Sequence, residues 1–200
     1  MRLDRDFSEF IGFLSAHEVR FLVVGGYAVA VHGHPRYTGD LDVWVLVHGG
    51  LTIRADVRTL AVVPTSRRYL TENEIARRLL VFFGDRADPT VSQWSAAHTD
   101  LHWANLMEPD LVIVDWEGWG IAPVGFDAAT LYVHSLLQPA IAEQVRAEFN
   151  ELLEHRDGLI SQLYVTTRML LRIEHGDYPD LAVLLHRNAE RVLRQLSGRR

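Results

Sequence analysis

The first part of the chain combines a helical repeat of apolar residues with two short apolar runs. In residues 6–17, apolar side chains recur every three or four positions, which predicts an amphipathic helix. Residues 21–24 and 41–47 are short and mostly apolar, which predicts two strands. Between them, residues 28–33 fit a short helix that ends at Gly33. These elements predict a small α/β segment at the front of the chain.

From about residue 50 onward, the apolar residues follow helical spacing. Residues 54–63 and 71–83 predict two helices. Thr71 stands at the start of the second one and Glu74 follows three positions later, which is the capping-box pattern. The second helix is therefore expected to take Thr71 as its N-cap.

One short strand and a run of helices complete the pattern. Residues 111–115 are an apolar run that ends in aspartate, which predicts a buried strand. Four helices are predicted beyond it, with Gly158, Gly176 and Pro179 as breaks, at residues 127–137, 139–153, 158–175 and 179–196. The chain is therefore expected to be α+β, with domains at residues 1–48 and 49–200.

Composition narrows the class of protein. The chain has 200 residues, of which 48% are hydrophobic, and a formal charge of −6, so neither a nucleic-acid nor a membrane partner is expected. It has no cysteine, which excludes disulfides and thiolate chemistry. The first residues lack the apolar core of a signal peptide, and no apolar run is long enough to span a bilayer. These features predict a cytoplasmic protein.

Three side chains with oxygen ligands have the spacing that phosphoryl transfer requires. Asp100 and Asn105 form a D-x-x-x-x-N pattern, in which the carboxylate accepts the proton of the attacking hydroxyl and the amide binds a metal ion. Asp115 follows the predicted strand and offers a second metal ligand. A D-x-x-x-x-N spacing alone is common in turns, but its combination with a strand that ends in Asp115 favours a phosphoryl-transfer site.

A resemblance to a known family rests on the sequences HTDLHWAN at 98–105 and VDWE at 114–117. They resemble the catalytic and metal-binding segments of the aminoglycoside phosphotransferase and choline-kinase-like family, over about residues 51–197. The resemblance implies Mg²⁺ and ATP as cofactors and a hydroxyl of a small molecule as the acceptor. It also implies a catalytic base at Asp100 and magnesium ligands at Asn105 and Asp115.

The same family implies supporting residues. His98 and Asp127 would support the loop by hydrogen bonding, and Thr99 stands where the family usually has glycine. Acceptors in this family are held by acidic residues, for which this chain offers Glu117, Asp157 and Glu174. A kinase of this type also clamps its nucleotide with a lysine, whereas this chain contains no lysine.

A second constellation lies in the front segment. Gly25 and Gly26 precede a predicted helix, where backbone N–H groups can approach a triphosphate. Asp40 and Asp42 flank one residue, so on a strand both carboxylates point the same way and can share metal ions. This order resembles the opening of a minimal nucleotidyltransferase of the AbiEii type, over residues 5–47.

The combined expectation is a mainly helical, protein-kinase-like C-terminal lobe preceded by a small α/β nucleotidyltransferase-like segment. Its expected function is ATP- and magnesium-dependent phosphorylation of a small-molecule hydroxyl. Two alternatives stay open. One is nucleotidyl transfer at the front segment, which needs a third carboxylate for which Asp56 is the nearby candidate. The other is a catalytically inactive fusion remnant, because each half lacks a part of its enzyme.

Overall fold

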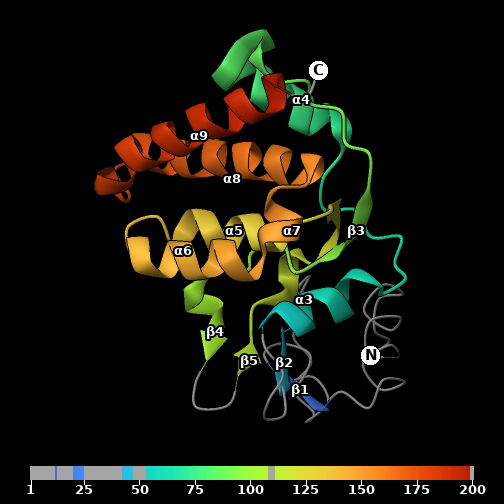
Figure 1. Ribbon diagram of the computed structural model, residues 1–200. Coiled ribbons are helices and arrows are strands. Elements are labelled where there is room, and N and C mark those ends of the chain that lie inside the picture. Colours follow the sequence, from blue (N-terminus) through green and yellow to red (C-terminus); the bar gives the residue numbers. More distant parts are fainter. Residues whose placement is uncertain (1–11, 13–19, 25–41, 47–52, 108–110, 199–200) are drawn as a thin grey trace. The chain divides into compact units, whose positions relative to one another are not determined.

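The computed structural model describes residues 12, 20–24, 42–46, 53–107 and 111–198 (Figure 1). The described residues form a mixed α+β structure that is mainly helical. The chain divides into two compact units, which we call unit 1 (residues 1–69 and 95–121) and unit 2 (residues 70–94 and 122–200). The domain boundary predicted after residue 48 lies outside the described residues, as do the helices predicted at 6–17, apart from Gly12, and at 28–33.

Unit 1 contains a four-stranded antiparallel sheet with the order β1-β2-β5-β4. The predicted front strands are confirmed as β1 (Arg20–Val24) and β2 (Asp42–Leu46). Strand β5 (Val112–Ile113) lies between β2 and β4 (Leu106–Met107), and it pairs with β2 through Val45 opposite Ile113. Strands expected in two different domains therefore share one sheet.

Two further strands, β3 (Trp94–Ala97) and β6 (Gly120–Pro123), pair with each other and were not predicted. Both contain small residues and lack the β-branched run that marks most strands in a sequence. Beside β6, the segment at Arg68 runs parallel to Ile121, which accepts a hydrogen bond from the N–H of Tyr69 at 3.1 Å.

In unit 1, α3 (Ile53–Ala61) buries Val57 and Leu60 and confirms the first of the predicted central helices. The second is confirmed as α4 (Glu72–Phe83) of unit 2. Its capping box forms as expected. Glu74 N–H donates to the Thr71 hydroxyl, and Thr71 N–H donates to the Glu74 carboxylate at 2.8 Å.

Five helices of unit 2 follow the predicted order. They are α5 (Phe126–His134), α6 (Pro139–Glu148), α7 (Asn150–Leu153), α8 (Arg156–Glu174) and α9 (Ala182–Ser197). One correction concerns Gly158, which is a residue of the first turn of α8 and not a break before it. A Cβ atom at Gly158 would lie 1.8 Å from the Leu152 carbonyl oxygen, so glycine allows a close backbone approach there. A second correction is that the helix predicted at 139–153 divides at Phe149.

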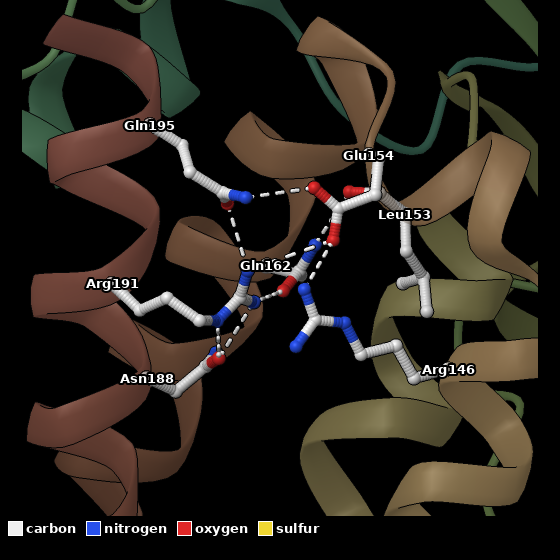
Figure 2. Close-up of polar contacts among 7 residues, drawn as sticks. All are labelled: Arg146, Leu153, Glu154, Gln162, Asn188, Arg191 and Gln195. Carbon is white, nitrogen blue, oxygen red and sulfur yellow. Dashed lines mark hydrogen bonds and ion pairs between the residues drawn. The ribbon is translucent and has the colours of Figure 1, made fainter. Parts of the chain in front are cut away.

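A network of polar side chains ties α9 to α8 and to the end of α7 (Figure 2). Arg191 donates to the side-chain oxygens of Gln162 and Gln195, at 2.7 Å each. The Glu154 carboxylate accepts from Gln195 at 2.8 Å and from Arg146 at 2.7 Å. Although burial opposes ionisation, the hydrogen bonds and the positive charges lower the pKa of Glu154. The network thus holds an ionised carboxylate between two arginines.

None of the described helices is both long and apolar enough to cross a membrane.

Candidate active site

His98, which follows β3, is buried and connects the two predicted catalytic segments. Its Nε2 lies 2.9 Å from the Val114 carbonyl oxygen, and its Nδ1 accepts a hydrogen bond from Asp100 N–H at 3.3 Å. Because a backbone N–H only donates and a carbonyl only accepts, the proton of the neutral ring is on Nε2. Burial lowers the pKa of His98 to about 4. The imidazole is therefore neutral at pH 7 and positions Asp100 through its backbone.

Asn105 holds the other side of the same peptide segment. It is the last residue of the short 3₁₀ helix η2 (Trp103–Asn105) and is buried. Its Nδ2 donates to the Asp100 carbonyl oxygen at 2.9 Å, which fixes the orientation of the amide. The Oδ1 atom is consequently directed away from this bond, and no described residue donates a hydrogen bond to it. A side-chain oxygen held in this way is suited to bind a hard cation.

Asp115 begins the turn that follows β5. Its backbone is left-handed, with φ 65° and ψ 62°, and it precedes the 3₁₀ helix η3 (Trp116–Gly118). Its side chain is exposed and makes no hydrogen bond or ion pair with the described part of the chain. The carboxylate is thus available to a ligand while its backbone is held in an uncommon conformation.

Side-chain donors hold the carbonyl groups on both sides of Asp115. On the strand side, the Val114 carbonyl accepts from His98. On the other side, the Glu117 carbonyl accepts from the Arg67 guanidinium, and the Gly118 carbonyl accepts from the Thr99 hydroxyl at 2.7 Å. The turn that carries the carboxylate is therefore built into the structure of unit 1 and is not a loose loop.

Thr99 has a backbone conformation that glycine adopts more easily than other residues. Its φ of 71° lies in the left-handed region, which a β-branched residue rarely occupies. Of the non-glycine residues described, only Thr99, Asp115 and Tyr178 have positive φ, and two of these three flank the candidate site. The hydrogen bond from the Thr99 hydroxyl to Gly118 opposes the strain.

The candidate base, Asp100, is partly exposed. Its side chain has a relative exposure of 35%, and its Oδ2 lies 3.4 Å from Nε2 of His102. The exposure leaves room for an acceptor hydroxyl to reach the carboxylate. Its backbone, in contrast, is bound on the N–H side by His98 and on the carbonyl side by Asn105.

Other predicted residues belong to unit 2 or have side chains outside the described residues. Asp127 is buried in the first turn of α5 in unit 2, so its support of the loop stays a prediction. For Asp42, the backbone is described, and it pairs with Val24 at the end of β1. The other residues of the alternative site lie outside the described residues, namely Gly25, Gly26 and Asp40.

Asp157, a candidate for acceptor binding, has a different role. It is fully buried in the first turn of α8. Its carboxylate accepts hydrogen bonds from the N–H and hydroxyl of Ser92, at 2.9 and 2.7 Å, and from the N–H of Gln93 at 2.9 Å. These donors belong to the chain itself, so Asp157 anchors the segment before β3 to α8. Of the other candidates, Glu117 and Glu174 are exposed.

Fit to a magnesium ion rests on the oxygens of Asn105 and Asp115. Among the residues that the structure describes, there is no group of three or more His, Cys, Asp or Glu side chains arranged to hold a metal. Magnesium does not require such a cage, since it keeps several waters and is usually bound by one or two carboxylates together with substrate phosphates. One accessible carboxylate and one oriented amide oxygen are ligands of the kind that such a site uses.

Comparisons of this chain with protein-family models, with curated proteins and with solved structures found no match. Assignment of the site therefore depends on the residues themselves. Two contributors were not expected from the sequence, namely the Arg67 guanidinium and the Thr99 hydroxyl. No sequence pattern marked the contact that either side chain makes.

Proposed function

We propose that this protein transfers a phosphoryl group from Mg-ATP to a hydroxyl of a small molecule. One observation carries the proposal: His98 and Asn105 hold the two peptide groups of Asp100, and His98 also binds the carbonyl that precedes Asp115. The candidate base and both candidate metal ligands thus belong to one hydrogen-bonded network in unit 1. This mutual positioning supports a shared function of the three residues.

Each residue then has a distinct task. Asp100 orients the acceptor hydroxyl and accepts its proton, while the acceptor oxygen bonds to the γ-phosphorus and the bond to the leaving ADP oxygen breaks. Asn105 and Asp115 would hold Mg²⁺, which when bound offsets the negative charge of the phosphate groups. His98 stays neutral and holds Asp100 and the Asp115 turn in fixed positions relative to each other. The acceptor would approach through the exposed side of Asp100.

The proposal is tested by calorimetric titration with Mg-ATP, which measures binding, and by an assay for ADP release, which measures turnover. Asp115→Ala is expected to abolish Mg-ATP binding, because it removes the carboxylate ligand. Asp100→Asn is expected to bind Mg-ATP but to lower turnover with a hydroxyl acceptor by at least about a hundredfold, because the amide cannot accept the proton. A screen of aminoglycosides, choline-like amines and sugars supplies the acceptors.

A matched control is Asp85→Ala, which removes an exposed aspartate of the 3₁₀ helix η1 (Gly84–Arg86) in unit 2. It should leave binding and turnover unchanged. Wild-type protein that binds no Mg-ATP would contradict the proposal, and so would an Asp115→Ala variant with wild-type affinity.

A second candidate function is nucleotidyl transfer by the front segment. The antiparallel pairing of Val24 with Asp42 places the last residue of β1 opposite the first residue of β2. In α3, Oδ2 of Asp56 is buried without a hydrogen-bond partner among the described residues, and this burial raises its pKa to about 6. A carboxylate perturbed in this way is a candidate third ligand.

This second function is tested by measuring whether label from the α-phosphate of a nucleotide is incorporated into an acceptor. Asp42→Ala should abolish the incorporation, and its survival would dismiss the idea. A protein that neither binds nor turns over nucleotides in either assay would favour the third reading, an inactive fusion remnant.

A further inference from the structure

Arg67 is a cationic residue that touches the turn carrying Asp115. Its guanidinium donates to the Glu117 carbonyl oxygen and lies over the ring of Trp119, 5.9 Å from the ring centroid. Trp119 is fully buried, so this ring provides a fixed surface for the guanidinium. A stacked guanidinium that is also hydrogen-bonded has a defined orientation, unlike an arginine on an open surface.

The backbone directs Arg67 and its neighbour Arg68 to opposite sides. Ile121 N–H donates to the Arg67 carbonyl at 2.7 Å, and Tyr69 N–H donates to the Ile121 carbonyl, so this segment is extended along Ile121. Successive side chains of an extended segment alternate between its faces. Tyr69 lies on the same side as Arg67, since its ring is 3.6 Å from the position of a Cβ on Gly118. The exposed Arg68 side chain therefore points away from the turn.

The negative charges around the turn favour the presence of a positively charged group. Asp100, Asp115 and Glu117 place three carboxylates on the loop and the turn of the candidate site. These carboxylates repel an anionic nucleotide, and a cationic side chain near them reduces this repulsion. The chain contains no lysine, so this charge has to come from arginine or histidine. The buried His98 cannot supply it, because it is neutral at pH 7, and His102 lies against the carboxylate of Asp100.

We propose that Arg67 is a phosphate-binding residue of this site, with its guanidinium contacting phosphate oxygens of the bound nucleotide. The proposal rests on the phosphoryl-transfer function above and adds the group that replaces the missing lysine. Arginine suits this role because its planar fork matches two phosphate oxygens at once. The Glu117 carbonyl and the Trp119 ring then fix the fork beside Asp115.

The test compares Arg67→Gln with Arg68→Gln, which makes the same chemical change on the next residue. Glutamine keeps an N–H donor for the Glu117 carbonyl but removes the charge. We expect Arg67→Gln to weaken the binding of Mg-ATP and of Mg-tripolyphosphate by on the order of tenfold to a hundredfold, as for the loss of a charged hydrogen bond. Arg68→Gln should bind both ligands within about twofold of wild type. Calorimetric titration measures all four affinities.

The possible outcomes distinguish a failure of this inference from a failure of the proposed function. If wild type binds Mg-ATP, Asp115→Ala does not, and Arg67→Gln binds like wild type, then Arg67 is not a phosphate ligand and the proposed function survives. If wild type itself does not bind, the proposed function fails together with the inference. If Arg67→Gln melts at a much lower temperature than Arg68→Gln, the affinity of Arg67→Lys for the same ligands is the test instead. It keeps the charge but loses the fork, so a several-fold loss of affinity is expected, and wild-type affinity would overturn the inference.

Discussion

His98 determines the local geometry of the candidate site at the scale of single residues. A protonated ring could not accept the hydrogen bond from Asp100 N–H, so the arrangement exists only while the imidazole is neutral. The low pKa and the hydrogen bonds are thus two aspects of the same burial. The other groups at the site depend on this ring, because it joins the segment of Asp100 to that of Asp115.

This coupling predicts a pH dependence of stability. The pKa of His98 is near 4 in the folded chain, below its ordinary value of 6.5, so the unfolded chain binds the proton more tightly. The free energy of unfolding should therefore fall as the pH is lowered from about 6.5 to about 4, by up to about 3 kcal/mol from this residue. Urea titrations at several pH values measure the loss.

The control is His98→Gln, which keeps an N–H donor for Val114 but cannot titrate. This variant should be less sensitive to pH over the same range. An imidazole NMR signal of His98 that titrates near its ordinary value would contradict the prediction.

Three residues of the candidate site could be selected as candidates from the sequence alone, for a physical reason. Asp100, Asn105 and Asp115 are near one another along the chain, so their spacing already encodes a shared loop and strand. Arg67 was not predictable in this way, because it reaches the turn only through the pairing of its segment with Ile121. Contacts between distant segments leave no local pattern in a single sequence.

At the scale of elements, helices were predicted better than strands. The helix α4 was found with its N-cap because twelve residues repeat an apolar face and the capping box marks the start. The strand β4 has two residues and β3 has four, which is too short for an alternating pattern. Their pairing partners, and not their own residues, make them strands.

Gly158 provides a test of helix packing. Replacement by alanine would place a Cβ within 1.8 Å of the Leu152 carbonyl oxygen, so either α8 or the end of α7 must move. We expect Gly158→Ala to lower the free energy of unfolding by about 2 kcal/mol or more, measured by urea denaturation. Relief of this clash requires the backbone to move, because the atom that the Cβ meets does not belong to a flexible side chain.

The matched control is Gly198→Ala at the end of α9. A Cβ there would meet its nearest neighbour, the Arg194 carbonyl oxygen, at an ordinary 3.6 Å, and φ is −75°. Its stability should stay within about 0.5 kcal/mol of wild type. Equal effects of the two substitutions would show that the close approach at Gly158 is not a constraint.

At the scale of the whole molecule, the candidate site belongs to a unit assembled from two separate stretches of chain. Residues 95–121 carry Asp100 and Asp115, and residues 1–69 supply β1, β2, α3 and Arg67. Because β2 pairs with β5, residues 51–200 alone would leave one edge of β5 without its partner. The resemblance to a kinase lobe over 51–197 therefore concerns a segment that lacks part of its sheet.

This arrangement predicts the behaviour of the segment 51–200 when it is expressed alone. Amide hydrogens of β5 should exchange at least about tenfold faster than in the full chain, because the pairing with β2 is lost. Amides in the middle of α8, in unit 2, serve as the internal reference. Hydrogen exchange measured by mass spectrometry distinguishes the two regions, and equal protection of β5 in both proteins would contradict the prediction.

The pairing of β2 with β5 also has a consequence for synthesis on the ribosome. When β1 and β2 emerge from the ribosome, Val112 and Ile113 have not yet been made. The edge of β2 that pairs with β5 therefore stays unpaired while the intervening chain is translated. Contacts between such distant residues form slowly, and an unpaired edge can join another nascent chain in the meantime. The sheet next to Asp115 is thus completed late, and the yield of folded protein should be sensitive to translation rate and to chaperones that cover exposed strands.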